Sequence, residues 1–468
     1  MKLFKKVPCA IDRDKLLFSR RDLIKLIVPI LLQQILSVTV GTVDSMMVSH
    51  AGEAAVSGVS LVNMLDTVLV IFFTAMVTGG SVVLSQALGR RKNDDVLESA
   101  KQLLYITVIF AIILTTTVLI FRYSILGLLF GEVEADVMQS AREYFFFVAL
   151  SFPLLAINSV CDACFRVSGN TRMVLNVSII INIINVCGNA TLIYGFKLGA
   201  MGAAISTAFA RLCGSVILLI LVHRKKYIVH IENTFNYKPD IRIIKKILRI
   251  GIPNGIENTM FQFGRLLTQT LISTMGTNVI AANAVALTIS GYQYMTGTAC
   301  SSAMIPIVGR CIGASDEKQA KYYSKVILAL NYALIWTVIL VSLIFLKPLI
   351  AAYDLSETSS QISRNLILYH AIIATFIWPI GFMLPSSFRA SGDVKYSLVV
   401  SMFSMWVFRV AGAYLCALDT INVFGIFTLS GLNLGIYGVW FAMTVDWVFR
   451  STLFLVHYIR GKWLRKKL

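Results

Sequence analysis

An internal repeat constrains this chain more than any other feature of its sequence. Three pairs of segments show the repeat, at a spacing of 224 positions for the first two pairs and 223 for the third: Pro29–Leu32 with Pro253–Ile256, Gly89–Asp94 with Gly313–Glu317, and Phe165–Arg172 with Phe388–Lys395. A duplicated membrane bundle commonly places its binding region between two similar halves. We therefore expect the functional residues to lie at the interface of the two halves.

The composition places both halves in a membrane. Hydrophobic residues make up 57% of the chain and charged residues 14%, and the charges lie between apolar runs of about 20 residues, the length that spans a bilayer. The sequence predicts an all-α polytopic membrane protein with twelve transmembrane helices in two six-helix repeats. The expected spans are residues 22–48, 57–85, 99–121, 143–165, 173–196, 200–222, 248–275, 279–308, 322–346, 365–388, 396–417 and 434–457.

The distribution of lysine and arginine predicts the orientation of these spans. Basic residues gather in both terminal segments and in alternate loops, which places both termini in the cytoplasm by the positive-inside rule. Because each repeat has six spans, the two repeats should be related by a pseudo-twofold axis along the membrane normal. We expect an N-lobe at 1–222, a cytoplasmic linker at 223–247 and a C-lobe at 248–468, in the plasma membrane of a bacterium.

Several function classes find no support in the sequence. The net charge of +18 lies in loops beside spans, where it sets topology and meets anionic membrane lipid, so we expect no nucleic-acid partner. No phosphate-binding G-x-x-x-x-G-K-[ST] loop and no H-E-x-x-H metal motif occurs. Cys161 and Cys164 have metal-site spacing, but without a second pair they are expected to be buried apolar residues. We expect neither an enzyme nor a bound cofactor.

Four polar residues inside the predicted N-lobe spans suggest an ion site. Asp44, Asn185, Asn189 and Thr207 all fall about 10 to 17 Å below the outer surface, at 1.5 Å of rise per helical residue. Their carboxylate, amide and hydroxyl oxygens suit a hard cation such as Na⁺, or a proton on the aspartate. The alternative is that the amides and the hydroxyl only hold helices together, as such groups often do in membrane bundles.

Other intramembrane residues are weaker candidates, because each has an equally good structural explanation. Asp446 and Arg450 are expected to pair within one helix, whereas Arg211 and Arg409 have no nearby acid in the sequence and should find one on another helix. A secondary polar or substrate site is predicted from Asp66, Glu257, Arg265, Tyr292 and Trp378. Glu257 and Arg265, eight residues apart, either pair or face the cavity.

The motifs taken together resemble those of the multidrug and toxic compound extrusion family. The resemblance rests on Pro29, on the segment Val43–Val48, on the two Phe-Arg-x-Ser-Gly loops at 165–169 and 388–392, and on Leu198–Ala204. It implies a twelve-helix carrier with alternating access, and an ion site of one branch would fall on Asp44, Asn185, Asn189 and Thr207. That branch has a second aspartate where this chain has Asn189.

The leading functional hypothesis is a secondary active efflux transporter. The resemblance implies export of small organic, often cationic, compounds in exchange for H⁺ or Na⁺. An alternative is a flippase for an anionic lipid-linked precursor, which Arg211, Arg265 and Arg409 would suit. The expected partners are these small molecules and membrane lipid, and the chain is expected to be a monomer.

Overall fold

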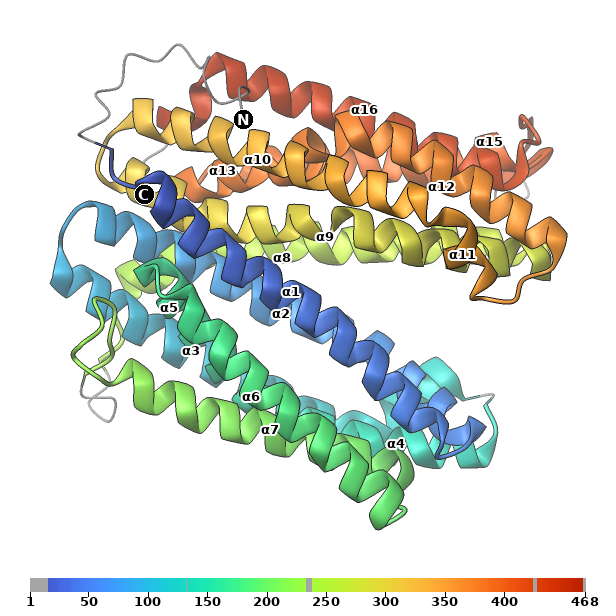
Figure 1. The fold of residues 1–468 in the computed structure, drawn as a ribbon, viewed down its shortest axis with the longest axis horizontal. Coiled ribbons are helices and arrows are strands. Elements are labelled where there is room, and N and C mark those ends of the chain that lie inside the picture. The colour runs from blue at the N-terminus through green and yellow to red at the C-terminus, as the bar shows by residue number, and fades with distance from the viewer. Residues whose placement is uncertain (1–15, 132, 233–237, 424–426, 466–468) are drawn as a thin grey trace. The chain divides into compact units, whose positions relative to one another are not determined.

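The computed structural model describes residues 16–131, 133–232, 238–423 and 427–465. The chain forms two compact units, Phe18–Gly255 and Ile256–Leu468, and Leu16 and Leu17 belong to the second. In the first unit the helices lie side by side along their length (Figure 1). They are α1 (Arg20–Ser49), α2 (Glu53–Gly89), α3 (Asn93–Phe130), α4 (Ala135–Leu150), α5 (Phe152–Ser168), α6 (Thr171–Asn189) with the π-helix η2 (Ala190–Gly195), and α7 (Gly199–Val222).

The second unit repeats this order of elements. Helix α8 (Ile241–Ser273) connects the two units, and the rest of the second unit is helical except for one hairpin. Its elements are α9 (Thr277–Gly313), α10 (Glu317–Ile344), α11 (Leu346–Ala351), α12 (Glu357–Trp378), η3 (Pro379–Met383), α13 (Pro385–Ser391), α14 (Val394–Phe403), η4 (Ser404–Ala411), α15 (Gly412–Ala417), β1 (Thr420–Val423), β2 (Phe427–Ser430), α16 (Gly435–Arg460) and η5 (Lys462–Arg465).

These elements make the twelve predicted spans. Within the described residues, nine helical segments are long and apolar enough to cross a membrane, and the bent pair α4 and α5 makes a tenth. The remaining two spans are α8 and α9, whose apolar character is diluted by polar residues such as Lys245, Arg249 and Gln293. The all-α polytopic fold with two six-helix repeats is therefore confirmed.

Several predicted spans are not single α-helices. The span expected at 143–165 begins earlier, at Ala135, and bends by 45° between α4 and α5. Pro153 lies in the first turn of α5, where it has no N–H to continue the preceding helix. The spans expected at 173–196, 365–388 and 396–417 each contain a π-helical segment, η2, η3 or η4. Such wide turns are frequent at functional sites.

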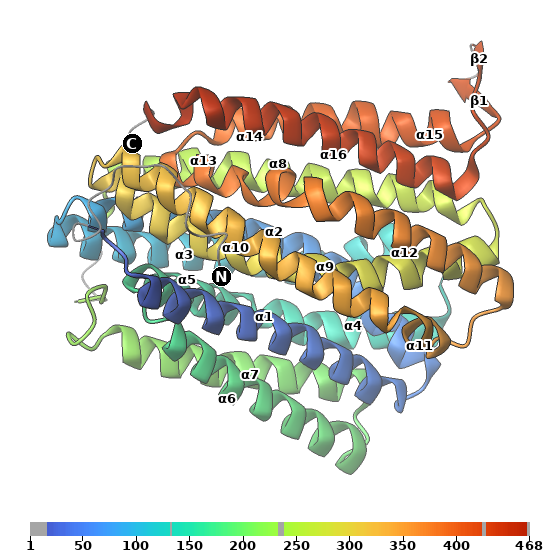
Figure 2. The same cartoon turned by 45° about the horizontal axis from the view of Figure 1, so that its top comes forward.

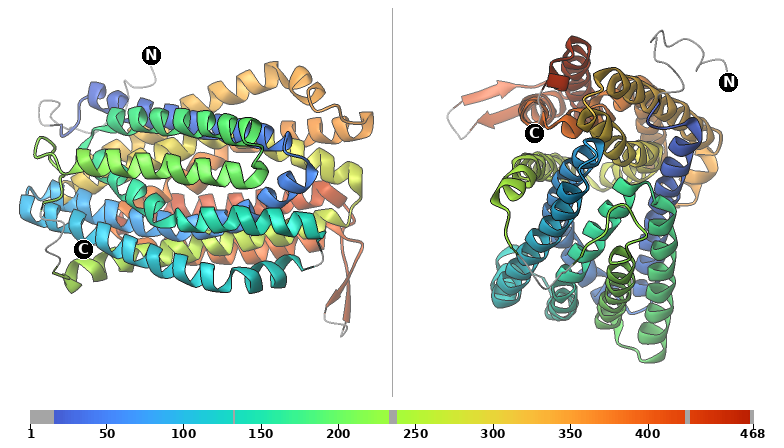
Figure 3. Two further views of the ribbon diagram at one scale, coloured as in Figure 1. Left: turned by 90° about the horizontal axis from the view of Figure 1, so that it is seen from below. Right: turned by 90° about the vertical axis from the view of Figure 1, so that its left-hand side faces the viewer.

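The hairpin is an insertion that distinguishes the second unit. β1 and β2 pair antiparallel, with Thr420 opposite Ser430, and they project from the ends of α15 and α16 (Figures 2 and 3). Before the hairpin, residues correspond across the repeat at 223 or 224 positions. After it, Gly199 corresponds to Gly435, a spacing of 236 positions, and both have positive φ angles, 54° and 55°. The repeat thus continues through α16 in a shifted register.

The boundary between the units falls inside α8 because the first half of that helix packs against α2. A Cβ atom added at Gly79 of α2 would lie 2.5 Å from the Ile247 carbonyl oxygen and 2.9 Å from the Gly251 nitrogen. Small residues allow backbones to approach this closely in membrane proteins. The second half of α8, from Ile256, packs with the second unit, where Gly264 meets the Met405 side chain of η4 in the same way.

We expect Gly79→Ala to destabilise the protein, because the new methyl group must separate the α2 and α8 backbones. The cost should be about 1–3 kcal/mol, measured as a lower midpoint of thermal unfolding in detergent. Gly127→Ala on α3 is the matched control, since nothing lies within 4 Å of a Cβ there. An equal effect of both substitutions would contradict close packing at Gly79.

Candidate functional site

The structure brings the four predicted ion-site residues of the first unit together. Asn189 of α6 donates from Nδ2 to Asp44 Oδ1 of α1 at 2.7 Å. The orientation of the Asn185 amide that satisfies its neighbours places its nitrogen 2.9 and 3.1 Å from the Asp44 carboxylate oxygens, and its oxygen accepts from Thr207 Oγ1 of α7 at 3.2 Å. One carboxylate therefore faces two amides and, through Asn185, a hydroxyl.

The spacing of the two asparagines explains how α6 presents both side chains to Asp44. They are four residues apart and so lie on one face of the helix, and both are buried. The α6 and α7 backbones approach closely, because Ser206 Oγ donates to the Asn185 carbonyl at 2.7 Å and sits 2.4 Å from a Cβ built on Gly188. The π-helix η2 begins directly after Asn189, which widens the turn next to the cluster.

One acceptor in this cluster is left open. Asn189 Oδ1 is buried and has no hydrogen-bond partner among the described residues. An unsatisfied buried acceptor beside a carboxylate favours a bound cation or an added proton, because either removes the cost of the unpaired oxygen. Within the described residues, no group of three or more His, Cys, Asp or Glu side chains could hold a metal ion, so an ion here would have the single Asp44 carboxylate together with amide and hydroxyl oxygens.

Asp66 does not join the Asp44 cluster and instead faces an arginine. Its carboxylate lies 3.9 Å from Arg211 Nη2 of α7, while Arg211 Nη1 donates to Ser151 Oγ at 2.7 Å. The prediction that Arg211 finds an acid on another helix is therefore confirmed. This pairing neutralises both charges inside the membrane.

A second polar cluster occurs twice, at positions that the repeat relates. In the first unit, Arg166 Nη2 donates to Gln33 Oε1 at 2.8 Å and Gln33 Nε2 donates to Ser178 Oγ at 2.9 Å. In the second unit, Arg389 Nη2 lies 3.2 Å from Glu257 Oε1, which also accepts from Ser401 Oγ at 2.8 Å. Gln33 and Glu257 are 224 positions apart, and the two arginines and the two serines are each 223 apart.

The two copies keep the same charge balance with different residues. Where the second unit has the Glu257 carboxylate, the first has a neutral Gln33 and places its acid on Asp162, 3.9 Å from Arg166. The position of Asp162 corresponds to Pro385 in the second unit. Each arginine thus has one carboxylate, which is typical of a structural ion pair in a membrane span. Of the two pairings open to Glu257, the structure shows the one with Arg389 and not the one with Arg265.

The other predicted residues of the second unit fall into two groups. Asp446 and Arg450 pair within α16 at 3.1 Å, as predicted, and Arg409 of η4 finds the same Asp446 at 3.8 Å. Trp378 is buried and stacks between two other rings, Tyr294 and Phe382, with centroids 5.7 and 5.3 Å away. Tyr292 is 44% exposed and is not part of this stack.

Sequence reasoning missed some of these partners. The roles of Gln33, Arg166 and Arg389 are visible only when the two repeats are aligned at 224 and 223 positions, a comparison that the sequence permits. A buried chain from His370 Nδ1 to Gln293 Oε1 at 2.8 Å, and from Gln293 Nε2 to Ser342 Oγ at 2.8 Å, was also missed. No local motif in the sequence marks His370 or its partners.

Fold and sites together define a polytopic membrane protein of two repeated six-helix units that carry different charged clusters. A family model, MatE, matches residues 29–191 and 253–415. The chain therefore belongs to the MatE family, the multidrug and toxic compound extrusion family of membrane transporters, as its motifs predicted. Transporters of this family are not enzymes.

Individual relatives agree with this family over nearly the whole chain. "Probable multidrug resistance protein NorM" of Thermotoga maritima is 24% identical over 451 residues, which cover 96% of this chain and 94% of that protein. "Uncharacterized transporter YisQ" of Bacillus subtilis is 26% identical over 448 residues, 94% of each chain.

A solved structure supports the fold. A MOP superfamily transporter from Pyrococcus furiosus superposes with a TM-score of 0.84 at 19% identity, covering 96% of this chain and 97% of that one. The work on that protein describes reverse polarity of its binding pocket and suggests a different function for it. At this identity the likeness to the present chain concerns the fold alone.

We expect Glu257→Gln to destabilise the second unit by about 2–4 kcal/mol, because it leaves the Arg389 charge without its acid inside the bundle. Thermal unfolding in detergent should show this as a lower midpoint. Asp419→Asn, which removes an exposed carboxylate of the same unit, should change the midpoint little. The Ser397 and Ser401 hydroxyls both donate to Glu257, at 3.1 and 2.8 Å. A stable Glu257→Gln protein would mean that these two hydroxyls suffice to hold the side chain at position 257.

Proposed function

We propose that this protein is a secondary active transporter that exports small organic compounds in exchange for H⁺ or Na⁺ by alternating access. The observation that carries the proposal is the contact of Asp44 with Asn189 and Asn185 inside the first unit. An ionisable residue within a membrane span is costly and commonly marks an ion pathway. Asp44 has no cationic side chain paired with it in the described residues, unlike Asp66.

The ligand set supports either coupling ion. Na⁺ would gain the Asp44 carboxylate and the amide and hydroxyl oxygens around it, which are the oxygen ligands that hard cations prefer. A proton would neutralise Asp44 and give its carboxyl an O–H that can donate to the unpaired Asn189 Oδ1. A single carboxylate weakens the electrostatic attraction for Na⁺, so we favour the proton, with Na⁺ as a weaker competitor for the same oxygens.

The chain offers a mechanism by which occupancy of Asp44 can change the shape of α1. Pro29 lies inside this helix and removes one backbone hydrogen bond, and Gly41 has no neighbour within 4 Å of its Cβ position. The Gln33 amide is bonded to Ser178 of α6, on the N-terminal side of Asp44. Neutralising Asp44 would therefore act on the part of α1 that follows the anchored Gln33, where Gly41 has no close neighbour.

The substrate class and the setting follow from the family and from composition. Family resemblance favours organic cations, exported across a bacterial cytoplasmic membrane by a monomer with both termini in the cytoplasm. A flippase for an anionic lipid-linked precursor is the alternative. Asp66 neutralises Arg211, so only the arginines of the second unit are left to bind an anionic lipid headgroup.

Asp44→Asn should abolish gradient-driven transport, because the amide cannot bind a proton reversibly and carries no charge for Na⁺. The measurement is uptake of a fluorescent organic cation into inside-out proteoliposomes under separately imposed H⁺ and Na⁺ gradients. Asp94→Asn, an exposed change in the first turn of α3, is the control. Normal uptake by Asp44→Asn at equal protein content would refute the coupling role, and no uptake by wild type under either gradient would favour the flippase.

Asn189→Asp should shift the coupling preference toward Na⁺. A second carboxylate 2.7 Å from the first creates a site of higher negative charge, which favours a hard cation between the two groups. We expect the Na⁺ concentration for half-maximal transport to fall by about tenfold relative to wild type. Unchanged Na⁺ dependence would show that the cation does not bind between positions 44 and 189.

A further inference from the structure

The repeat reverses its polarity between the two units. The positions that correspond to Asp44, Asn185, Asn189 and Thr207 hold Thr268, Phe408, Gly412 and Met443, so the ion-site residues have no counterpart in the second unit. On the equivalent helices α8, η4 and α16, the second unit instead carries three arginines and one aspartate: Arg265, Arg409, Arg450 and Asp446. The first unit has Gly41, Val186, Gly214 and Ala210 at those positions.

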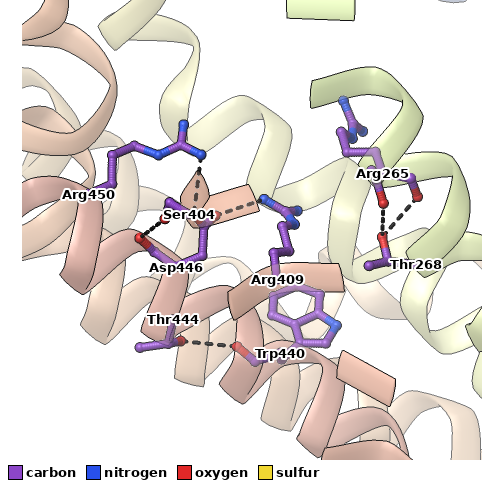
Figure 4. A network of polar contacts seen from close by, with 9 residues as sticks. Arg265, Thr268, Ser404, Arg409, Trp440, Thr444, Asp446 and Arg450 are labelled. Atoms are coloured by element: carbon purple, nitrogen blue, oxygen red, sulfur yellow. Dashed lines mark hydrogen bonds and ion pairs between the residues drawn. The ribbon is translucent and has the colours of Figure 1, made fainter. Parts of the chain in front are cut away.

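Close packing brings these residues together. Gly264 of α8 lies against the Met405 side chain of η4, which places Arg265 beside the π-helix that carries Arg409. Arg409 is within electrostatic range of both Arg265 and Arg450. Figure 4 shows the guanidinium groups of Arg409 and Arg450 on the same side of Asp446, with Arg265 on the neighbouring α8.

Asp446 does not balance these charges. It is fully buried and faces Arg450 at 3.1 Å and Arg409 at 3.8 Å, and it accepts from the Ser404 hydroxyl. One carboxylate thus serves two arginines. No group among the described residues accepts a hydrogen bond from the Arg409 side chain, and Arg450 Nε is buried without a partner there. An arginine presents five N–H donors, so Arg409, which is 9% exposed, still has donors for a ligand.

Arg265 adds a third positive charge that has no acid partner among the described residues, where its side chain donates a hydrogen bond only to Gln262 Oε1, at 3.4 Å. It is exposed within its unit and lies eight residues before the end of α8, about 12 Å along the helix. An arginine at this depth faces water or a binding partner rather than lipid, because hydrocarbon would cost several kcal/mol. The three arginines and Asp446 leave an excess of two positive charges.

Aromatic rings hold the arginines and border the same region. Arg409 and Arg450 lie over the Phe261 ring at 5.3 and 5.5 Å, and Arg450 lies over Phe382 at 5.0 Å. Phe382 in turn stacks on Trp378. Guanidinium groups fixed by stacking keep their edges free for an oxyanion, and the neighbouring rings can pack against an aromatic ligand.

We propose that Arg265, Arg409 and Arg450 form an anion-binding site in the second unit that takes an aromatic carboxylate, sulfonate or phosphate. As a substrate site it rests on the export function proposed above, and it extends the range of exported compounds from organic cations to organic anions. The anion supplies negative charge that Asp446 alone does not provide for the three arginines. Its aromatic ring lies against the aromatic residues around Phe261. A lipid phosphate offers the same chemistry as a soluble phosphate or carboxylate.

The test is equilibrium binding to full-length protein in nanodiscs of zwitterionic lipid, without any gradient. The probes are 1-naphthoate and the size-matched cation 1-naphthylmethylammonium, followed by calorimetry. We expect Arg265→Gln and Arg409→Gln each to weaken naphthoate binding at least tenfold without strengthening or weakening the cation. Arg364→Gln, an exposed change on α12, is the matched control. Equal naphthoate affinity in all three variants, or no naphthoate binding by wild type, would overturn the proposal.

Three additions make the result unambiguous. Arg409→Gln leaves Asp446 and Arg450 as a neutral pair, and Arg265 is exposed, so at least one variant should keep the wild-type unfolding midpoint. Asp44→Asn should bind naphthoate normally while losing transport, which separates failure of the anion site from failure of the coupling proposal. Adding phosphatidylglycerol to the discs distinguishes the sources, because displacement of naphthoate identifies a lipid headgroup as the anion and no displacement identifies a soluble one.

Discussion

The cost of placing a charge in hydrocarbon decides where almost every ionisable side chain in this fold lies. Three ion pairs each join one arginine to one carboxylate, either within a helix or between helices. They are Arg166 with Asp162, Arg389 with Glu257, and Arg211 with Asp66. The first two pairs show how strict this requirement is. The acid is Asp162 in the first unit and Glu257 in the second, and these are not equivalent positions of the repeat. The arginine and the serine do occupy equivalent positions, and each arginine has one carboxylate in both units.

Against this background, the exceptions indicate function. Among the described residues, Asp44 has amide partners and no cation, Arg409 shares its acid with Arg450, and Arg265 has no acid. One unit therefore has an uncompensated negative group and the other an uncompensated positive cluster, on helices that the repeat relates. A structural pair needs no such imbalance, whereas a site that binds and releases a charged ligand does, because its charge must be satisfied only in one state.

Much of this arrangement can be predicted from the sequence. Most of the twelve spans follow from apolar length, and the grouping of Asp44, Asn185, Asn189 and Thr207 follows from helical rise and the four-residue spacing of the asparagines. The pairing of Glu257 could not be chosen from sequence alone, because Arg265 on its own helix competes with Arg389, which is distant in the chain. The π-helix η4 was also not predictable, since no local motif in the sequence marks it.

The opposite polarity of the two clusters has an energetic consequence for exchange. If one proton enters for each organic cation that leaves, no net charge moves, and only the pH gradient drives export. If one proton enters for each organic anion that leaves, two positive charges effectively move inward. Each charge gains about 2.3 kcal/mol per 100 mV of an inside-negative potential, so the same proton site would export anions against a far steeper gradient than cations. The proposed acidic coupling site in one unit, together with the proposed basic ligand site in the other, would allow this use of the membrane potential.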